Sequence, residues 1–108
     1  MNNDPSIWES AEAEELTTAL LAINTPELMK AFLRDIMTEK EITEFSKRLQ
    51  AAKMLIDSVK YTDVAQVTGL SSRTIARISV WIKEGNSGYR QVITNLKAHH
   101  SHTPPARD

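Results

Sequence analysis

The sequence has 108 residues, of which 13 are lysine or arginine and 14 are aspartate or glutamate, so its formal net charge is −1. A chain of this length builds one modest domain that buries about 60–68% of its unfolded surface, and such small domains often dimerise. It contains no cysteine, which excludes a disulfide framework and a thiolate metal site. No apolar run approaches the roughly 18 residues of a membrane span, and the N-terminus lacks a secretory signal pattern, so we expect a cytoplasmic protein.

The charge is divided unevenly along the chain. Residues 1–46 carry three basic and ten acidic side chains, a net charge of −7, whereas residues 47–108 carry ten basic and four acidic ones, a net charge of +6. This asymmetry indicates either a polyanionic partner for the basic half or two solvated surfaces that attract each other. Charge alone leaves both interpretations open.

The first part of the chain predicts two helices. Glycine is scarce and no β-hairpin turn pair interrupts two alternating runs, so the fold class is expected to be all-α. Asp4-Pro5 is typical of a helix start, with a proline just inside the first turn, and predicts a helix over about 6–23. Thr25-Pro26 repeats that pattern and predicts the next helix.

The longest predicted helix begins at Thr38. Thr38 and Glu41 form a capping box, in which the hydroxyl and the carboxylate each satisfy a backbone amide. Apolar residues then recur every three or four positions for about four turns, which predicts the central helix of the fold. These residues are Ile42, Phe45, Leu49, Ala52 and Ile56.

Residues 61–83 have the pattern of a helix-turn-helix. Thr62 is expected to cap a short first helix, and Gly69 permits the left-handed backbone conformation that ends it. Ser71 or Ser72 is expected to cap the second helix. Thr68 replaces the usual apolar residue before the glycine, and we expect its methyl group to turn inward.

The second of these helices is predicted to have an aliphatic back and a basic front. At about 100° per residue, three isoleucines fall on one side, while Arg73 and Arg77 fall on the other. Arginine can bind guanine through two hydrogen bonds or clamp a phosphate, and a capped helix start also favours phosphate. Helices joined by a short glycine-containing turn are a DNA-binding geometry. The alternatives are a plain solvated helix or a protein-docking module without DNA binding.

From this geometry we expect a homodimeric transcriptional regulator, most simply a repressor, whose helix-turn-helix binds duplex DNA. The expected major-groove residues are Ser71, Ser72, Arg73, Thr74, Ala76 and Arg77, and the expected backbone contacts from the first helix are Lys60 and Thr62. A symmetric dimer would place two such helices about 34 Å apart.

The remaining segments carry no catalytic or metal-binding pattern. A last amphipathic helix is expected to end near residue 98, which gives a single helical domain over 6–98 between a flexible N-terminus (1–5) and a disordered tail (99–108). Three histidines lie in that tail, without the fixed geometry that a zinc site needs. They are His99, His100 and His102. We therefore expect neither an enzyme nor a cofactor.

Three stretches of the sequence resemble the Trp repressor superfamily, and within it the bacterial YerC/YecD group. They are MTEKEITEFSKRLQAAKML, YTDVAQVTGLSSRTIARI and EGNSGYRQVI, and the resemblance covers roughly 31–93. It implies a six-helix, intertwined homodimer that binds operator DNA through its helix-turn-helix. In the Trp repressor the second helix of this motif enters the major groove.

The resemblance also raises the question of a small-molecule co-repressor. In the tryptophan-binding member two arginines hold the ligand, and the matching positions resemble Arg48 and Arg77. The residue after the second arginine is a glycine in that member, whereas Ile78 stands here and would occupy the indole space. The resemblance therefore disfavours tryptophan sensing and leaves a ligand-gated repressor as an alternative.

Overall fold

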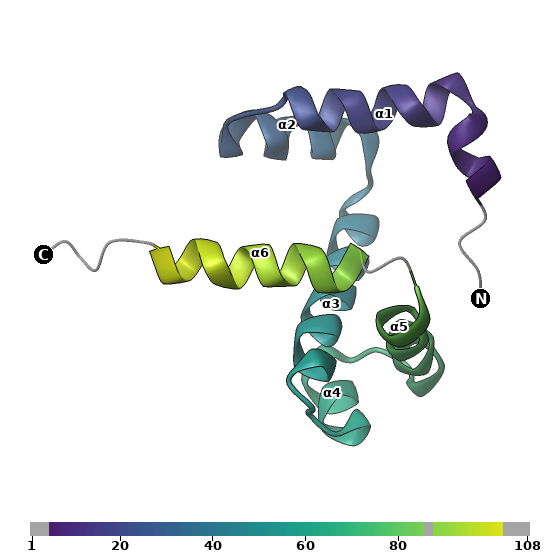
Figure 1. Cartoon of the computed structure of the whole chain (residues 1–108), viewed down its shortest axis with the longest axis vertical. Helices are drawn as coiled ribbons and strands as arrows, with labels where there is room; N and C mark the ends of the chain where they lie inside the picture. Colours follow the sequence, from purple (N-terminus) through teal and green to yellow (C-terminus); the bar gives the residue numbers. More distant parts are fainter. Residues whose placement is uncertain (1–4, 86–87, 103–108) are drawn as a thin grey trace, which may run out of the picture. The chain divides into compact units, whose positions relative to one another are not determined.

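The computed structural model describes residues 5–85 and 88–102, with side chains for 6–85 and 88–98, and these residues are all-α. In chain order the elements are η1 (Pro5–Glu9), α1 (Ala11–Ala22), α2 (Pro26–Ile36), α3 (Glu39–Ile56), α4 (Tyr61–Thr68), α5 (Ser72–Glu84) and α6 (Gly88–His102) (Figure 1). The expected all-α class with six α-helices is confirmed. None of the described helices combines the length and the apolar character that crossing a bilayer demands.

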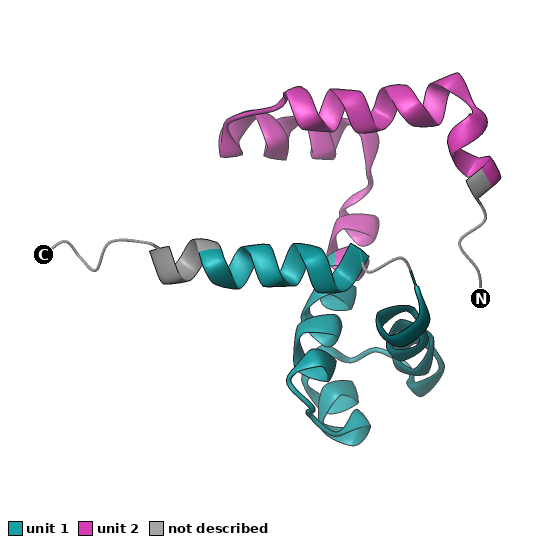
Figure 2. Ribbon diagram, viewed as in Figure 1, with its two compact units in different colours: residues 1, 46–108 teal, residues 2–45 magenta. Residues whose placement is uncertain are grey.

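The described residues fall into two compact units, and the boundary lies inside α3 (Figure 2). One unit ends at Phe45 and the other begins at Ser46. The expected single domain over 6–98 stays a prediction. Residues 1–4 and 103–108, which belong to the expected flexible end and the expected tail, lie outside the described residues. The last helix continues to His102, beyond its expected end.

In the first unit, α1 begins later than the sequence predicted. The expected continuous helix is divided, because Pro5–Glu9 form a short 3₁₀-helix and the Ser10 hydroxyl caps α1 by accepting the N–H of Ala13 at 3.0 Å. The start of α2 is as predicted: the Thr25 hydroxyl accepts the N–H of Leu28 at 3.1 Å. The predicted start at Asp4-Pro5 was therefore wrong for the α-helix, which begins after the serine cap at Ser10.

The capping box of α3 is confirmed. The N–H of Thr38 donates to Oε1 of Glu41 at 2.9 Å, and the N–H of Glu41 donates to Oγ1 of Thr38 at 3.1 Å. Further along this helix, Ala52 is buried as expected, whereas Phe45 is exposed.

The second unit holds the hydrophobic core. In this unit α4 packs against α5, and α5 packs against α6. The buried hydrophobic residues are Ala51, Ala52, Val64, Leu70, Ile75, Ile78, Ile82 and Ile93. The predicted aliphatic back of α5 is therefore confirmed, and its burial provides most of the attraction that holds α5 in place.

The turn between α4 and α5 forms as expected at Gly69, which has a φ of 77° and donates its N–H to the carbonyl of Ala65 at 2.8 Å. The prediction that Thr62 caps α4 was wrong, because the cap residue is Lys60 and its side chain makes no capping bond. Ser71 caps α5, since its hydroxyl accepts the N–H of Thr74 at 3.1 Å.

Thr68 contributes more than the inward methyl group that the sequence predicted. The residue is 4% exposed. Its hydroxyl donates to the carbonyl of Val64 at 2.7 Å and accepts the N–H of Leu70 at 3.2 Å. The hydroxyl thereby satisfies a buried amide that the left-handed turn removes from helical bonding.

Candidate nucleic-acid interface

The outward surface of α5 is basic and lies opposite the buried isoleucines. Arg73, Arg77 and Ala76 are all exposed, and Ser72 at the start of the helix is exposed as well. The small side chain of Ala76 lets another surface come close to the backbone between the two arginines. This arrangement agrees with the predicted aliphatic back and basic front.

The start of α5 is held by two hydroxyl groups. Ser71 accepts the N–H of Thr74 and donates its own proton to Oγ1 of Thr74, each at 3.1 Å. Ser71 is exposed and Thr74 is half-buried. The cap leaves other amides of the first turn of α5 free of helical partners, which is favourable for an anion.

The start of α4 offers a second polar contact region in the same unit. Lys60 and Thr62 are exposed, and neither side chain is used for capping. Tyr61 between them is 45% exposed. The two residues expected from the sequence to contact a DNA backbone are thus exposed to solvent, and their contact with DNA stays a prediction.

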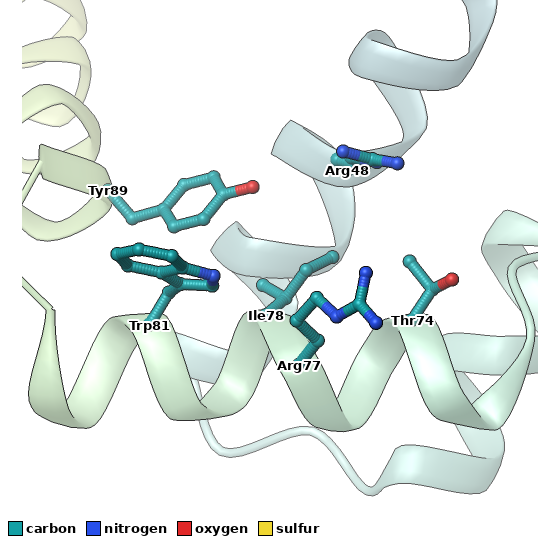
Figure 3. Close-up of a pocket in the computed structure, with 6 residues that line it drawn as sticks. All are labelled: Arg48, Thr74, Arg77, Ile78, Trp81 and Tyr89. Atoms are coloured by element: carbon teal, nitrogen blue, oxygen red, sulfur yellow. The ribbon is translucent and has the colours of Figure 1, made fainter. Parts of the chain in front are cut away.

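A pocket of about 180 Å³ lies beside α5 (Figure 3). Its lining residues come from α3, α5 and α6, and they are Arg48, Thr74, Arg77, Ile78, Trp81 and Tyr89. Figure 3 shows the two aromatic rings at one end of the pocket and the polar groups of Thr74 and Arg77 at the other. The two arginines that the resemblance singled out as ligand candidates therefore line one pocket.

The aromatic part of this pocket was not anticipated. Trp81 follows Ile78 by one helical turn, so a shared face of α5 could have been read from the sequence. Tyr89 joins them only because α6 folds back onto α5. Burial raises the pKa of the Tyr89 hydroxyl above the ordinary value for tyrosine, and the positive charge of Arg48 offsets part of that rise.

Metal binding finds no support in the residues whose side chains are described. Among them, no group of three or more histidine, cysteine, aspartate or glutamate residues is arranged to hold a metal ion. The side chains of His99, His100 and His102 lie outside this set.

Comparison with known proteins agrees with the helical arrangement described above. The model of the Trp repressor protein family matches residues 11–97. The uncharacterized protein YerC of Bacillus subtilis is 29% identical over 86 residues, covering 80% of this chain and 83% of that protein.

Two crystal structures are also similar. One is of a TrpR-like protein from Eubacterium eligens, with 33% identity and a TM-score of 0.81 over 85% of this chain and 95% of that one. The other is of a protein from Staphylococcus aureus proposed to be a Trp repressor, with 29% identity and a TM-score of 0.82 over 89% of this chain and 96% of that one. These matches agree with the expectation of a regulator rather than an enzyme, and the chain belongs to the Trp repressor protein family.

Proposed function

We propose that the protein is a sequence-specific DNA-binding transcriptional regulator of the repressor type, with α5 as its recognition helix. The observation that carries this proposal is the orientation of α5: its isoleucines are buried, while Arg73 and Arg77 are exposed on the opposite side. A helix fixed from behind with an exposed basic front is suited to enter a major groove.

The exposed residues divide into two roles. The proposed base-reading and groove-lining residues are Ser71, Ser72, Arg73, Thr74, Ala76 and Arg77, and the proposed backbone anchors are Lys60 and Thr62. The guanidinium group of an arginine can donate two hydrogen bonds to O6 and N7 of guanine, which gives a preference for particular sequences. A lysine beside a phosphate adds affinity that is independent of sequence.

We further propose that the protein acts as a homodimer. No residue of α1 or α2 is buried, although α2 is strongly amphipathic. The exposed large hydrophobic residues of the unit formed by residues 2–45 include Ile7, Trp8, Leu16, Leu21, Leu28, Ile36 and Phe45. An exposed apolar surface of this extent is unfavourable in water, and a second copy of the chain would cover it.

Selection of bound duplexes from a random pool tests the proposal. A recovered pseudo-palindrome with half-sites about one helical turn apart supports a dimer that reads sequence. On the selected duplex, Arg73→Ala should cost about 1–3 kcal/mol and relax base preference, whereas Lys60→Ala should weaken all sequences alike. If no sequence is enriched and no duplex is retained at low salt, a protein-docking module replaces the proposal.

A ligand-gated repressor is the second candidate, and the pocket of Figure 3 favours it. Two arginines and a hydroxyl at one pocket suit a carboxylate, and aromatic rings suit an apolar group. Against it, the buried Ile78 side chain forms part of the wall. Calorimetry with a panel of amino acids tests this candidate, because the absence of heat with every member would remove amino-acid gating.

A further inference from the structure

Lys47 of α3 lies beside the turn of the helix-turn-helix. Its Nζ atom is 4.0 Å from the point that a Cβ on Gly69 would occupy. Gly69 is exposed and connects α4 to the start of α5. An ammonium group from a helix earlier in the chain is therefore placed at the junction of the two helices, which the sequence pattern alone did not reveal.

The ammonium group of Lys47 has no partner within the described part of the chain, neither a hydrogen bond nor an ion pair. The residue is half-buried, so its aliphatic stem is packed while its charged end reaches the turn. The next residue, Arg48, lines the pocket together with Arg77. Two consecutive basic residues of α3 therefore lie beside the helix-turn-helix, Lys47 at its turn and Arg48 at the pocket next to α5.

The ammonium group of Lys47 could serve either the end of α4 or a ligand outside the chain. An ammonium group at the end of α4 is favoured by the partial negative charge of that helix end. A residue that served only this purpose would be expected to donate a hydrogen bond to one of the last carbonyl groups of α4. Lys47 makes no such bond among the described residues, so its donors stay available for a ligand outside the chain.

We propose that Lys47 binds a backbone phosphate of the duplex, so that α3 is part of the nucleic-acid interface together with α4 and α5. This inference rests on the proposed function. Phosphate suits the site because the exposed turn leads directly into the capped start of α5, where amides of the first turn also favour an anion. The lysine contributes a point charge and no base preference.

The test compares Lys47→Gln with wild-type protein on a selected and on a random duplex over a range of salt concentrations. We expect the same fold-loss on both duplexes and a salt slope that is smaller by about 1. Between about 50 and 200 mM salt, the loss of affinity should then be roughly three- to fourfold smaller for the variant than for wild type.

Lys53→Gln is the matched control. Lys53 is exposed on the same helix, six residues later, and is rotated by about 120° from Lys47. We expect it to leave the salt slope unchanged. Thermal unfolding of both variants is measured in parallel, and we expect both to keep the wild-type midpoint within the error of the measurement.

The outcomes separate this inference from the proposed function. If Arg73→Ala behaves as proposed while Lys47→Gln keeps the wild-type slope, only the role of Lys47 is refuted. If Lys47→Gln lowers the unfolding midpoint without changing the slope, Lys47 stabilises the turn and the inference is also wrong. If wild-type protein binds no duplex at low salt, both proposals fail together.

Discussion

Gly85 lies so close to Trp81 that a Cβ atom at residue 85 would be 2.5 Å from the carbonyl oxygen of Trp81 and 2.8 Å from its Cε3 atom. The backbone at Gly85 can therefore lie this close to Trp81 only without a side chain at this position. Arg90 supports the same junction, since its Nε donates to the carbonyl of Ile82 at 3.2 Å. These contacts hold α6 in the place from which Tyr89 reaches the pocket.

Gly85→Ala should therefore lower the free energy of unfolding by about 1–3 kcal/mol, because backbone and indole must move apart to admit the methyl group. Gly88→Ala is the control, since nothing lies within 4 Å of its Cβ position and alanine favours the helix. The control should be neutral or stabilising by up to about 1 kcal/mol. Equal denaturation midpoints for both variants would show that the contact at Gly85 is unimportant.

Thr68→Val should destabilise the protein although it preserves the shape of the side chain. Without the hydroxyl, the buried N–H of Leu70 loses its acceptor, at a cost of about 1–3 kcal/mol. Thr68→Ser retains the hydroxyl and should recover most of that loss. Urea denaturation measures both variants, and the hydrogen-bond explanation is wrong if serine is no better than valine.

Ser71 has a capping role that can be separated from contact with DNA. Ser71→Ala should cost about 0.5–2 kcal/mol of stability, because the N–H of Thr74 loses its acceptor. Ser71→Asp keeps a good cap, so its stability should stay near wild type while its negative charge repels phosphate. In thermal unfolding Ser71→Ala should thus be the less stable of the two variants. In duplex titration Ser71→Asp should be the weaker binder. If Ser71→Asp binds the duplex with wild-type affinity, Ser71 does not lie near the DNA.

Because the pKa of the Tyr89 hydroxyl is raised, we expect the free energy of unfolding to fall in alkaline solution. Burial raises the pKa of its hydroxyl above that of an unfolded tyrosine, so the folded state holds the proton more tightly. Its contribution is fully present below the unfolded pKa and is lost as the pH rises through the folded pKa. Tyr89→Phe should flatten the fall in unfolding free energy above about pH 10. If the free energy of unfolding falls equally steeply in wild-type protein and in Tyr89→Phe, the fall is caused by groups other than Tyr89.

The helix-turn-helix was predictable because its determinants are local. A left-handed turn at Gly69 and a serine cap three residues before Thr74 need only neighbouring residues, and both are present. The isoleucines of α5 follow one helical period, so their burial could be read from spacing. The exposed orientation of Arg73 and Arg77 followed from the same period.

Other features depend on contacts between distant parts of the chain. The start of α1 is an exception, because its serine cap at Ser10 is local and yet the start was predicted at Asp4-Pro5 instead. The meeting of Trp81 and Tyr89 depends on the packing of α6, and the position of Lys47 depends on the packing of α3. Spacing within one helix carries no information about such contacts.

The slope of log affinity against log salt concentration, measured for the wild-type protein on duplex DNA, tests the central claim most directly. If the exposed cations Lys60, Arg73 and Arg77 bind the phosphate backbone, the slope should be steeply negative, by about 0.9 for each phosphate contacted. Replacing both Arg73 and Arg77 by alanine should then make it shallower. A protein that binds no duplex at low salt, or whose affinity is independent of salt, would contradict the claim.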